Sequence, residues 1–267
     1  MVEIIYLKIL ILIVWYLMKN KKIRSLSFDL WLTLIYELDL TAHSDIRRNI
    51  RSEKIKKKLS NYNIHLSVDK ITSAFNDISK TINSGHEKGL DKRFNEWVLQ
   101  GLNRLPIDRE KITRKLVKEI ADAIDEAFLE HPPQLLSGVL EMLTLLKNKY
   151  NIILISNTGL TSPEAYIRWF KRIELFDKFD GLFFSNELSL AKPSKKIFRL
   201  AFEAINASPE EVLHIGDNLD TDVCGAKNVG AQTVWITNGV KTKFFCKPDY
   251  VVDSVLEVKD IINKNYT

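Results

Sequence analysis

The sequence contains little cysteine, glycine or proline. Its 267 residues include 2 cysteines, 10 glycines and 7 prolines. Cys224 and Cys246 are too few for a disulfide framework or a zinc-binding pattern, so we expect two reduced thiols in a cytoplasmic protein. The low glycine and proline content, together with 45% apolar residues, argues against extended disorder. It allows one large core, or a core with a smaller accessory domain.

The excess of positive charge is also small. A formal net charge of +5 permits attraction to anionic substrates. It does not by itself indicate nucleic acid, because aromatic residues do not alternate with basic ones as they do on a nucleic-acid-binding surface. We therefore expect a small anionic substrate and no nucleic acid, while the oligomeric state stays open.

The sequence has no uninterrupted hydrophobic run of membrane-spanning length. Residues 2–17 are very apolar, but two charged residues interrupt them, and a span needs about 20 predominantly apolar residues. The basic cluster of residues 19–22 follows this stretch, whereas a secretory signal carries its positive charge first. Either residues 1–17 are a short extension that anchors the protein in a membrane, or translation starts at Met18. We favour Met18, and in both cases expect the remainder to be cytoplasmic.

Short apolar runs alternate with amphipathic segments over the C-terminal half. The runs at residues 151–156, 181–185, 211–217 and 232–237 are typical of buried strands. Helices are predicted between and after them, at residues 135–150, 166–176, 195–205 and 222–230. A further strand is predicted at residues 23–28. This alternation indicates an α/β fold with a parallel sheet covered on both faces.

Residues 37–133 have a different pattern. Charged residues are more frequent, and apolar residues recur at spacings of three and four, as at Ile71, Phe75 and Ile78, which indicates about four helices. We predict an all-helical cap domain at residues 37–133, inserted into an α/β core formed by residues 18–36 and 134–267.

Polar residues follow four of the predicted strands. They are Asp29, Ser156 with Asn157, the loop carrying Lys192, and Asp217. Ligands of open parallel sheets lie beyond the carboxyl ends of the strands, so we expect these residues to meet. Two neighbouring acids repel each other unless a cation lies between them, and Mg²⁺ suits such a site when phosphate also binds there. Asp29 could then act as a nucleophile, with Ser156 and Lys192 binding phosphoryl oxygens.

Four segments resemble the motifs of the haloacid dehalogenase-like (HAD) hydrolase superfamily, in that family's order. They are SFDLWLT, ILISN, AKPSKKIF and HIGDNLDTDVCGA. The resemblance covers residues 23–36 and 135–252, and the helical insertion lies where that family places its first type of cap. It implies a Rossmann-like three-layer core. It also implies a Mg²⁺-dependent phosphatase that acts on a small phosphorylated metabolite through an aspartyl-phosphate intermediate.

The resemblance also implies roles for individual residues. Asp29 would be the nucleophile and a metal ligand, and Asp217 and the backbone carbonyl of Trp31 would complete the metal site. Ser156 and the backbone of Asn157 would bind the transferring group. The remaining roles concern the surroundings of the nucleophile: Lys192 would screen it and the phosphoryl oxygens, Thr33 would order the substrate-binding loop, and Asp222 would support the lysine or the metal shell.

Trp31 stands where the phosphatases of this superfamily carry a second aspartate that protonates the leaving oxygen. An indole is no titratable acid, and general acid–base help is worth about 10²–10⁴-fold in rate. Three functions stay open: a phosphatase for easily released groups, or with an acid from the cap; a 2-haloacid dehalogenase-type hydrolase, since those enzymes carry an aromatic here; and a non-catalytic phospho-ligand-binding protein. Asp217 and Asp222 favour the phosphatase, because the dehalogenases replace the leading acid and need no metal.

The segment of residues 46–59 is strongly basic. Helical spacing spreads its charges around the element, so we expect a solvated face. The alternative is that Arg47 or Arg51 faces the mouth of the site and attracts anionic substrates.

Overall fold

The computed structural model describes residues 23–39, 42–243 and 245–266. The apolar segment of residues 2–17 and the choice between Met1 and Met18 lie outside these residues. Within the described part of the chain, no helix is both long enough and apolar enough to cross a membrane.

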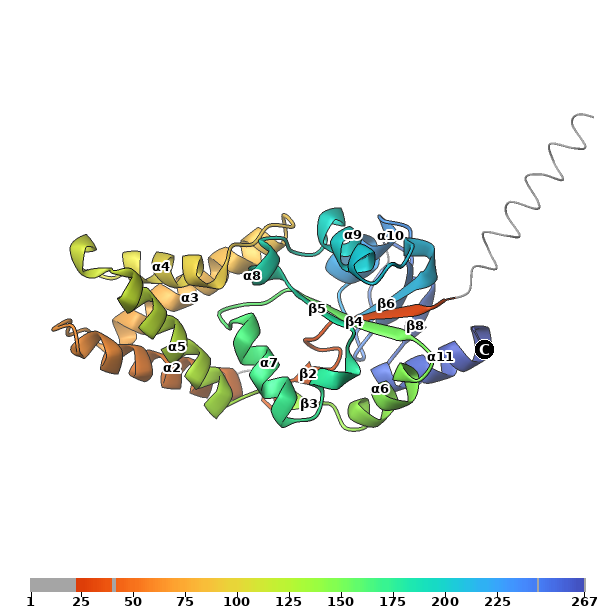
Figure 1. Ribbon diagram of the computed structural model, residues 1–267, viewed down its shortest axis with the longest axis horizontal. Coiled ribbons are helices and arrows are strands. Elements are labelled where there is room, and N and C mark those ends of the chain that lie inside the picture. Colours follow the sequence, from red (N-terminus) through yellow and green to blue (C-terminus); the bar gives the residue numbers. More distant parts are fainter. Residues whose placement is uncertain (1–22, 40–41, 244, 267) are drawn as a thin grey trace, which may run out of the picture.

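A six-stranded parallel sheet forms the centre of the molecule, with the strand order β5-β4-β1-β6-β7-β8 (Figure 1). All residues of β1 and β6 are buried, as expected for strands covered on both faces. All strands of this sheet except β8 were predicted, and β8 was missed because its apolar run is too short. The strands are β1 (Ser25–Phe28), β4 (Asn151–Ser156), β5 (Gly181–Phe184), β6 (Val212–Gly216), β7 (Gln232–Ile236) and β8 (Tyr250–Val252).

Helices cover both faces of the sheet, which makes three layers. Ile152 and Leu154 of β4 pack in one apolar core with α6, α7 and α11, while Ile153 and Ile155 pack in a second core with α9 and α10. These layers confirm the predicted Rossmann-like α/β core. Its helical segments are α6 (Val139–Lys147), α7 (Pro163–Arg172), η2 (Phe176–Lys178), α8 (Ser185–Leu188), α9 (Lys195–Ala204), η3 (Pro209–Glu211), α10 (Gly225–Lys227), η5 (Val255–Glu257) and α11 (Val258–Asn265).

The prediction of a single helix at residues 222–230 was wrong, because two short helical segments of different type cover this region. A π-helix, η4 (Leu219–Cys224), precedes the single turn of α10. It begins after Asn218, whose side chain accepts hydrogen bonds from the backbone N–H groups of Asp220 and the next residue. Asn218 is therefore the N-cap, and Asp220 is exposed beside it.

An all-helical insertion follows the first core strand, as predicted. Its helices, α2 to α5, lie at the opposite end of the molecule from the sheet (Figure 1). They enclose an apolar core of their own that contains Phe75, Phe94 and Trp97. A two-stranded antiparallel pair, β2 (Ile35–Tyr36) and β3 (Gln134–Leu135), joins the chain where it leaves and re-enters the core. The helical segments are α2 (Ala42–Ser60), α3 (Val68–His86), α4 (Phe94–Asn103), η1 (Arg109–Lys111) and α5 (Arg114–Glu130).

Cys224 and Cys246 form a disulfide, with their Cα atoms 5.5 Å apart. The prediction of two reduced thiols was therefore wrong. Cys224 ends η4, and Cys246 lies in the connection between β7 and β8, which folds back toward η4. Such a return of the chain leaves no mark in the sequence. Disulfides persist mainly in oxidising compartments, so the cysteines no longer support the expected cytoplasmic location.

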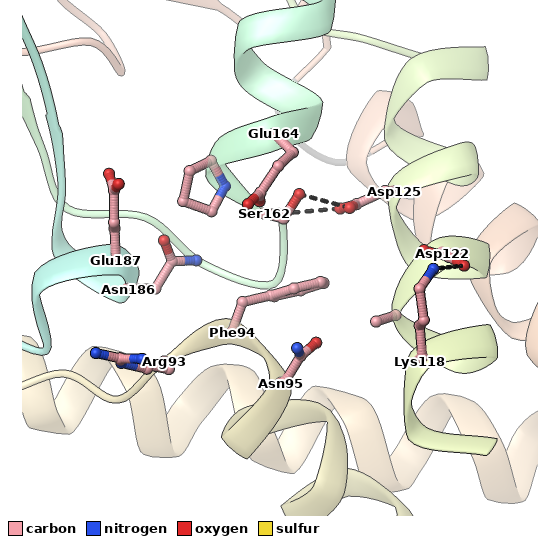
Figure 2. A pocket seen from close by; sticks show the side chains of 12 residues that line it. Arg93, Phe94, Asn95, Lys118, Asp122, Asp125, Ser162, Glu164, Asn186 and Glu187 are labelled. Carbon is pink, nitrogen blue, oxygen red and sulfur yellow. Dashed lines mark hydrogen bonds and ion pairs between the residues drawn. The ribbon is translucent and has the colours of Figure 1, made fainter. Parts of the chain in front are cut away.

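A hydrogen-bonded carboxylate links the helical insertion to the core. Asp125 of α5 accepts hydrogen bonds from the N–H and the hydroxyl of Ser162, at 3.0 and 2.5 Å, at the start of α7 (Figure 2). They lie beside a cavity of about 590 Å³ that is also lined by Asp122, Glu164 and Glu187. Burial, opposed by the bonds from Ser162, raises the pKa of Asp125 to about 6.

This raised pKa predicts that stability falls between pH 4 and pH 7. An unfolded aspartate has a pKa of about 3.9, so native Asp125 binds more protons between that value and about 6. Its contribution is complete below pH 4 and is lost as the pH rises through 6. We expect the free energy of unfolding of the protein, minus that of Asp125→Asn, to fall by about 2 kcal/mol over this range. Urea denaturation at several pH values measures this difference, and a constant or rising difference would contradict the account.

Candidate active site

Three carboxylates meet at the carboxyl edge of the sheet. Asp29 directly follows β1 and Asp217 directly follows β6, while Asp222 lies on η4. Each offers an oxygen atom, and these atoms all lie within 4.8 Å of one another. Because β1 and β6 are parallel neighbours, residues almost 190 positions apart reach the same place.

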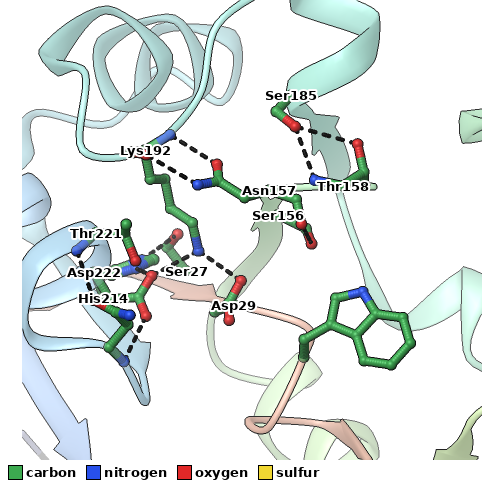
Figure 3. A network of polar contacts seen from close by, with 12 residues as sticks. Ser27, Asp29, Ser156, Asn157, Thr158, Ser185, Lys192, His214, Thr221 and Asp222 are labelled. Carbon is green, nitrogen blue, oxygen red and sulfur yellow. Dashed lines mark hydrogen bonds and ion pairs between the residues drawn. The ribbon is translucent and has the colours of Figure 1, made fainter. Parts of the chain in front are cut away.

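Lys192 lies between two of these carboxylates (Figure 3). Its Nζ donates hydrogen bonds to Oδ1 of Asp29 at 2.5 Å and to Oδ1 of Asp222 at 2.6 Å. The Lys192 and Asp222 side chains are almost fully buried, and Asp29 is 10% exposed. Each buried charge therefore has an opposite charge in hydrogen-bond contact, which offsets the cost of removing it from water.

Asp222 is held from several sides. The backbone N–H of Asn218 donates to its Oδ2 at 3.0 Å, and Nε2 of His214 lies 3.3 Å from its Oδ1. Nδ1 of His214 in turn lies 2.9 Å from the Ser27 hydroxyl. Gly216 makes room for this arrangement, since a Cβ there would lie 2.3 Å from Cγ of Asp222. The aspartate is thus fixed as the support of Lys192.

Asn157 positions the loop that carries Lys192. Its side-chain N–H donates to the Lys192 carbonyl at 2.9 Å, and its Oδ1 accepts from the Lys192 N–H at 2.8 Å. The sequence predicted a role only for the backbone of Asn157. This pairing of an amide side chain with a backbone 35 residues away has no sequence signal.

The carboxylates differ in how easily they ionise. Burial raises the pKa of Asp29 to about 6, although Lys192 opposes it. Burial, followed by repulsion from Asp29 and Asp222, raises the pKa of Asp217 to about 8. Burial also disfavours the charged Asp222, but Lys192 and His214 outweigh it and lower the pKa of that group. For Lys192, the two carboxylates outweigh burial and raise the pKa of the ammonium.

Asp217 is the carboxylate that lacks a counter-ion. Among the described residues, no side chain pairs with it, although it lies beside two other acids. A divalent cation bound by oxygen atoms would remove this repulsion, and Mg²⁺ prefers carboxylate ligands of this kind. The residues present therefore fit a magnesium ion held between Asp29 and Asp217.

Thr33 and Ser156, which were predicted to bind substrate, are buried and do not line the cavity. A cavity of about 650 Å³ opens over the carboxylates, and Thr33 and Ser156 are not among its lining residues. Both are fully buried. The Thr33 hydroxyl has no hydrogen-bond partner in the described part of the chain, and that of Ser156 donates to the carbonyl of Asn157 at 3.4 Å. The side chain of Thr33 is thus buried and does not reach the cavity.

Trp31 is half-buried and forms part of the cavity wall. Its indole N–H donates to the hydroxyl of Tyr166 at 3.1 Å, and its ring packs against the core below. The guanidinium of Arg47 lies 6.0 Å from the ring centroid. The sequence gives no sign of this contact, because Tyr166 lies 135 residues away on an apolar helix face.

Residues 24–230 match the profile of haloacid dehalogenase-like hydrolases, so the chain belongs to this family of hydrolases. It is 35% identical over 114 residues to a glyceraldehyde 3-phosphate phosphatase from Pyrococcus furiosus, which covers 40% of this chain and 48% of that protein. It is 27% identical over 175 residues to a pyrimidine 5′-nucleotidase from Escherichia coli, covering 65% and 71%. The chain thus spans about half the length of the first relative.

The fold is shared with solved structures. A HAD hydrolase from Bacillus subtilis bound to magnesium has a TM-score of 0.59 and 21% identity, covering 91% of this chain and all of that one. A 2-haloacid dehalogenase from Pseudomonas syringae has a TM-score of 0.64 and 17% identity, covering 91% and 99%. Both likenesses concern the fold alone.

We expect Lys192→Met to destabilise the protein strongly. The change leaves two buried carboxylates without their shared cation, and breaking a buried ion pair costs about 3–5 kcal/mol. Urea denaturation at pH 7 with chelator present measures the free energy of unfolding. Lys196→Met, which removes an exposed lysine from α9, is the matched control. An equally small effect of both changes would show that Lys192 does not hold the site together.

Proposed function

We propose that the protein is a Mg²⁺-dependent phosphatase that hydrolyses a small phosphorylated metabolite. The observation that carries this proposal is the cluster of Asp29, Asp217 and Asp222, in which Asp217 lacks a counter-ion. The phosphatases and nucleotidases among the relatives support it further.

The metal would be held by Asp29, Asp217 and the backbone carbonyl of Trp31. When bound, it would neutralise charge on the phosphoryl oxygens. Lys192 occupies Oδ1 of Asp29, which leaves Oδ2 as the nucleophile. Attack by Oδ2 on phosphorus forms the aspartyl phosphate and breaks the ester P–O bond, so the leaving group departs as an oxyanion that takes a proton from solvent. Water then attacks the aspartyl phosphate, which releases inorganic phosphate and restores the Asp29 carboxylate. Lys192 keeps Asp29 ionised at the start and remains beside the phosphoryl group.

The leaving group departs without a strong acid at the position of Trp31. The indole N–H of Trp31 is already bonded to Tyr166, and no carboxyl group replaces the missing aspartate at this position. His86, which lines the cavity from the cap, has its Nε2 2.9 Å from Asp91. We infer that the enzyme favours substrates whose leaving oxygen needs no proton, such as acyl and aryl phosphates.

A screen of phosphate esters tests this function. We expect Mg²⁺-dependent release of phosphate from aryl or acyl phosphates, with alkyl phosphates slower by about 10²-fold or more, the scale of general acid help. Asp29→Asn should abolish turnover. Trp31→Asp, which restores a carboxyl group, should narrow the gap between alkyl and aryl esters.

The same screen includes 2-haloacids without metal. Chloride release under those conditions would contradict the phosphatase function and identify the protein as a dehalogenase. An absence of turnover on every substrate, with phosphate esters still bound, would leave a non-catalytic binding protein.

A further inference from the structure

The cavity over the carboxylates adjoins a second cavity, which lies between the helical insertion and the core. Its volume is about 360 Å³. The two cavities share four lining residues: Trp31, Asn83, His86 and Asn157. A molecule whose phosphate lies at Asp29 can therefore extend past Trp31 into this space.

Three arginines of α2 line this second cavity, and none of the described residues that line it is acidic. Two of them are neutralised elsewhere. Arg47 forms hydrogen bonds of 2.7 and 2.9 Å with both carboxylate oxygens of Glu37, and Arg48 pairs with Asp45 at 2.7 Å. Arg48 is exposed, as expected for a solvated face, whereas Arg47 and Arg51 are half-buried and depart from that expectation.

Arg51 differs from its two neighbours. Among the described residues it pairs with no carboxylate. One Nη lies 3.4 Å from the amide oxygen of Asn76, its guanidinium lies 5.9 Å from the Phe75 ring centroid, and its Nε is buried without a hydrogen-bond partner. Burial, then Arg48 and Arg47, lower the pKa of Arg51 to about 10, so it stays charged at neutral pH.

Such an arrangement is costly without a ligand. Arg51 is half-buried, and even a partly desolvated charge without a counter-ion is unfavourable. Its buried Nε–H without an acceptor adds to that cost. The two Nη groups of a guanidinium also form an edge that binds a carboxylate or phosphate through two parallel hydrogen bonds, and the contact of one Nη with Asn76 is long, at 3.4 Å. The geometry therefore suits an anion that arrives with the substrate.

We propose that the substrate carries a second acidic group, which binds to Arg51 while its phosphate ester lies at Asp29. This inference rests on the proposed phosphatase function. The substrate class is then a phosphate monoester with a carboxylate or second phosphate at its far end. The intervening part contacts Trp31, Phe128 and Tyr166, which supply aromatic walls to the cavity.

A matched pair of esters tests this class. The carboxylate of 4-carboxyphenyl phosphate and the amide of 4-carbamoylphenyl phosphate have nearly the same size, but only the carboxylate is charged. The 3-substituted isomers place the same two groups at a different distance from the phosphate. We expect kcat/KM for the carboxylate ester to exceed that for the amide about 10- to 100-fold in at least one isomer, the scale of a charged hydrogen bond. In Arg51→Met this ratio should fall to about one. Lys57→Met, which removes an exposed charge from the same helix, should keep the ratio.

A ratio that is already one in the wild type, or one that Arg51→Met leaves unchanged, overturns the proposal. Thermal unfolding without ligand adds an independent readout. Arg51→Met should have a Tm equal to or above that of the wild type, because an uncompensated charge is removed. A clear drop in Tm would assign Arg51 a structural role.

Failure of the phosphatase function can be told apart from failure of the anion site. If the wild type hydrolyses neither ester, the Tm shift that each ester produces with Mg²⁺ is measured in Asp29→Asn and in Asp29→Asn/Arg51→Met. A larger shift by the carboxylate ester that depends on Arg51 supports the anion site even without turnover. Equal shifts by both esters overturn it.

Discussion

The buried ammonium of Lys192 between Asp29 and Asp222 is the interaction on which the rest of the site depends. It brings together the end of β1, the π-helix η4 and the loop before α9. The surrounding contacts serve this one: Asn157 fixes the lysine backbone, and His214 and Gly216 allow Asp222 to reach it. With Asp222 engaged in this way, Asp29 and Asp217 are left facing the cavity, where a bound metal ion would neutralise their mutual repulsion.

The helical insertion completes the site from the other side. Its helices α2, α3 and α5 form part of the wall of the second cavity, and α2 contributes three arginines to it. The carboxylates of the core line the neighbouring cavity. Trp31 stands between the two regions, bonded to Tyr166. The core would thus perform a reaction common to the family, while the insertion and Trp31 would restrict which phosphate esters undergo it. Both restrictions act on the substrate, one through its leaving oxygen and one through its far end.

Much of the core and the meeting of Asp29 with Asp217 could be predicted, because buried strands are apolar runs and parallel strands end at one edge. The other features arise from contacts between distant residues. The side-chain role of Asn157, the bond from Trp31 to Tyr166, the disulfide and the unpaired Arg51 each depend on how separate elements pack. Helical periodicity showed that the charges of α2 spread around it, but not which arginine lacks an acid partner.

The metal ion that Asp29 and Asp217 would share is tested most directly by diffraction from crystals grown with Mn²⁺. This ion replaces Mg²⁺ at oxygen sites and scatters anomalously. The account predicts one anomalous peak about 2–2.3 Å from a carboxylate oxygen of Asp29 and of Asp217, close to the carbonyl of Trp31. A peak bound by only one of the two aspartates, or no peak at this edge of the sheet, would contradict it.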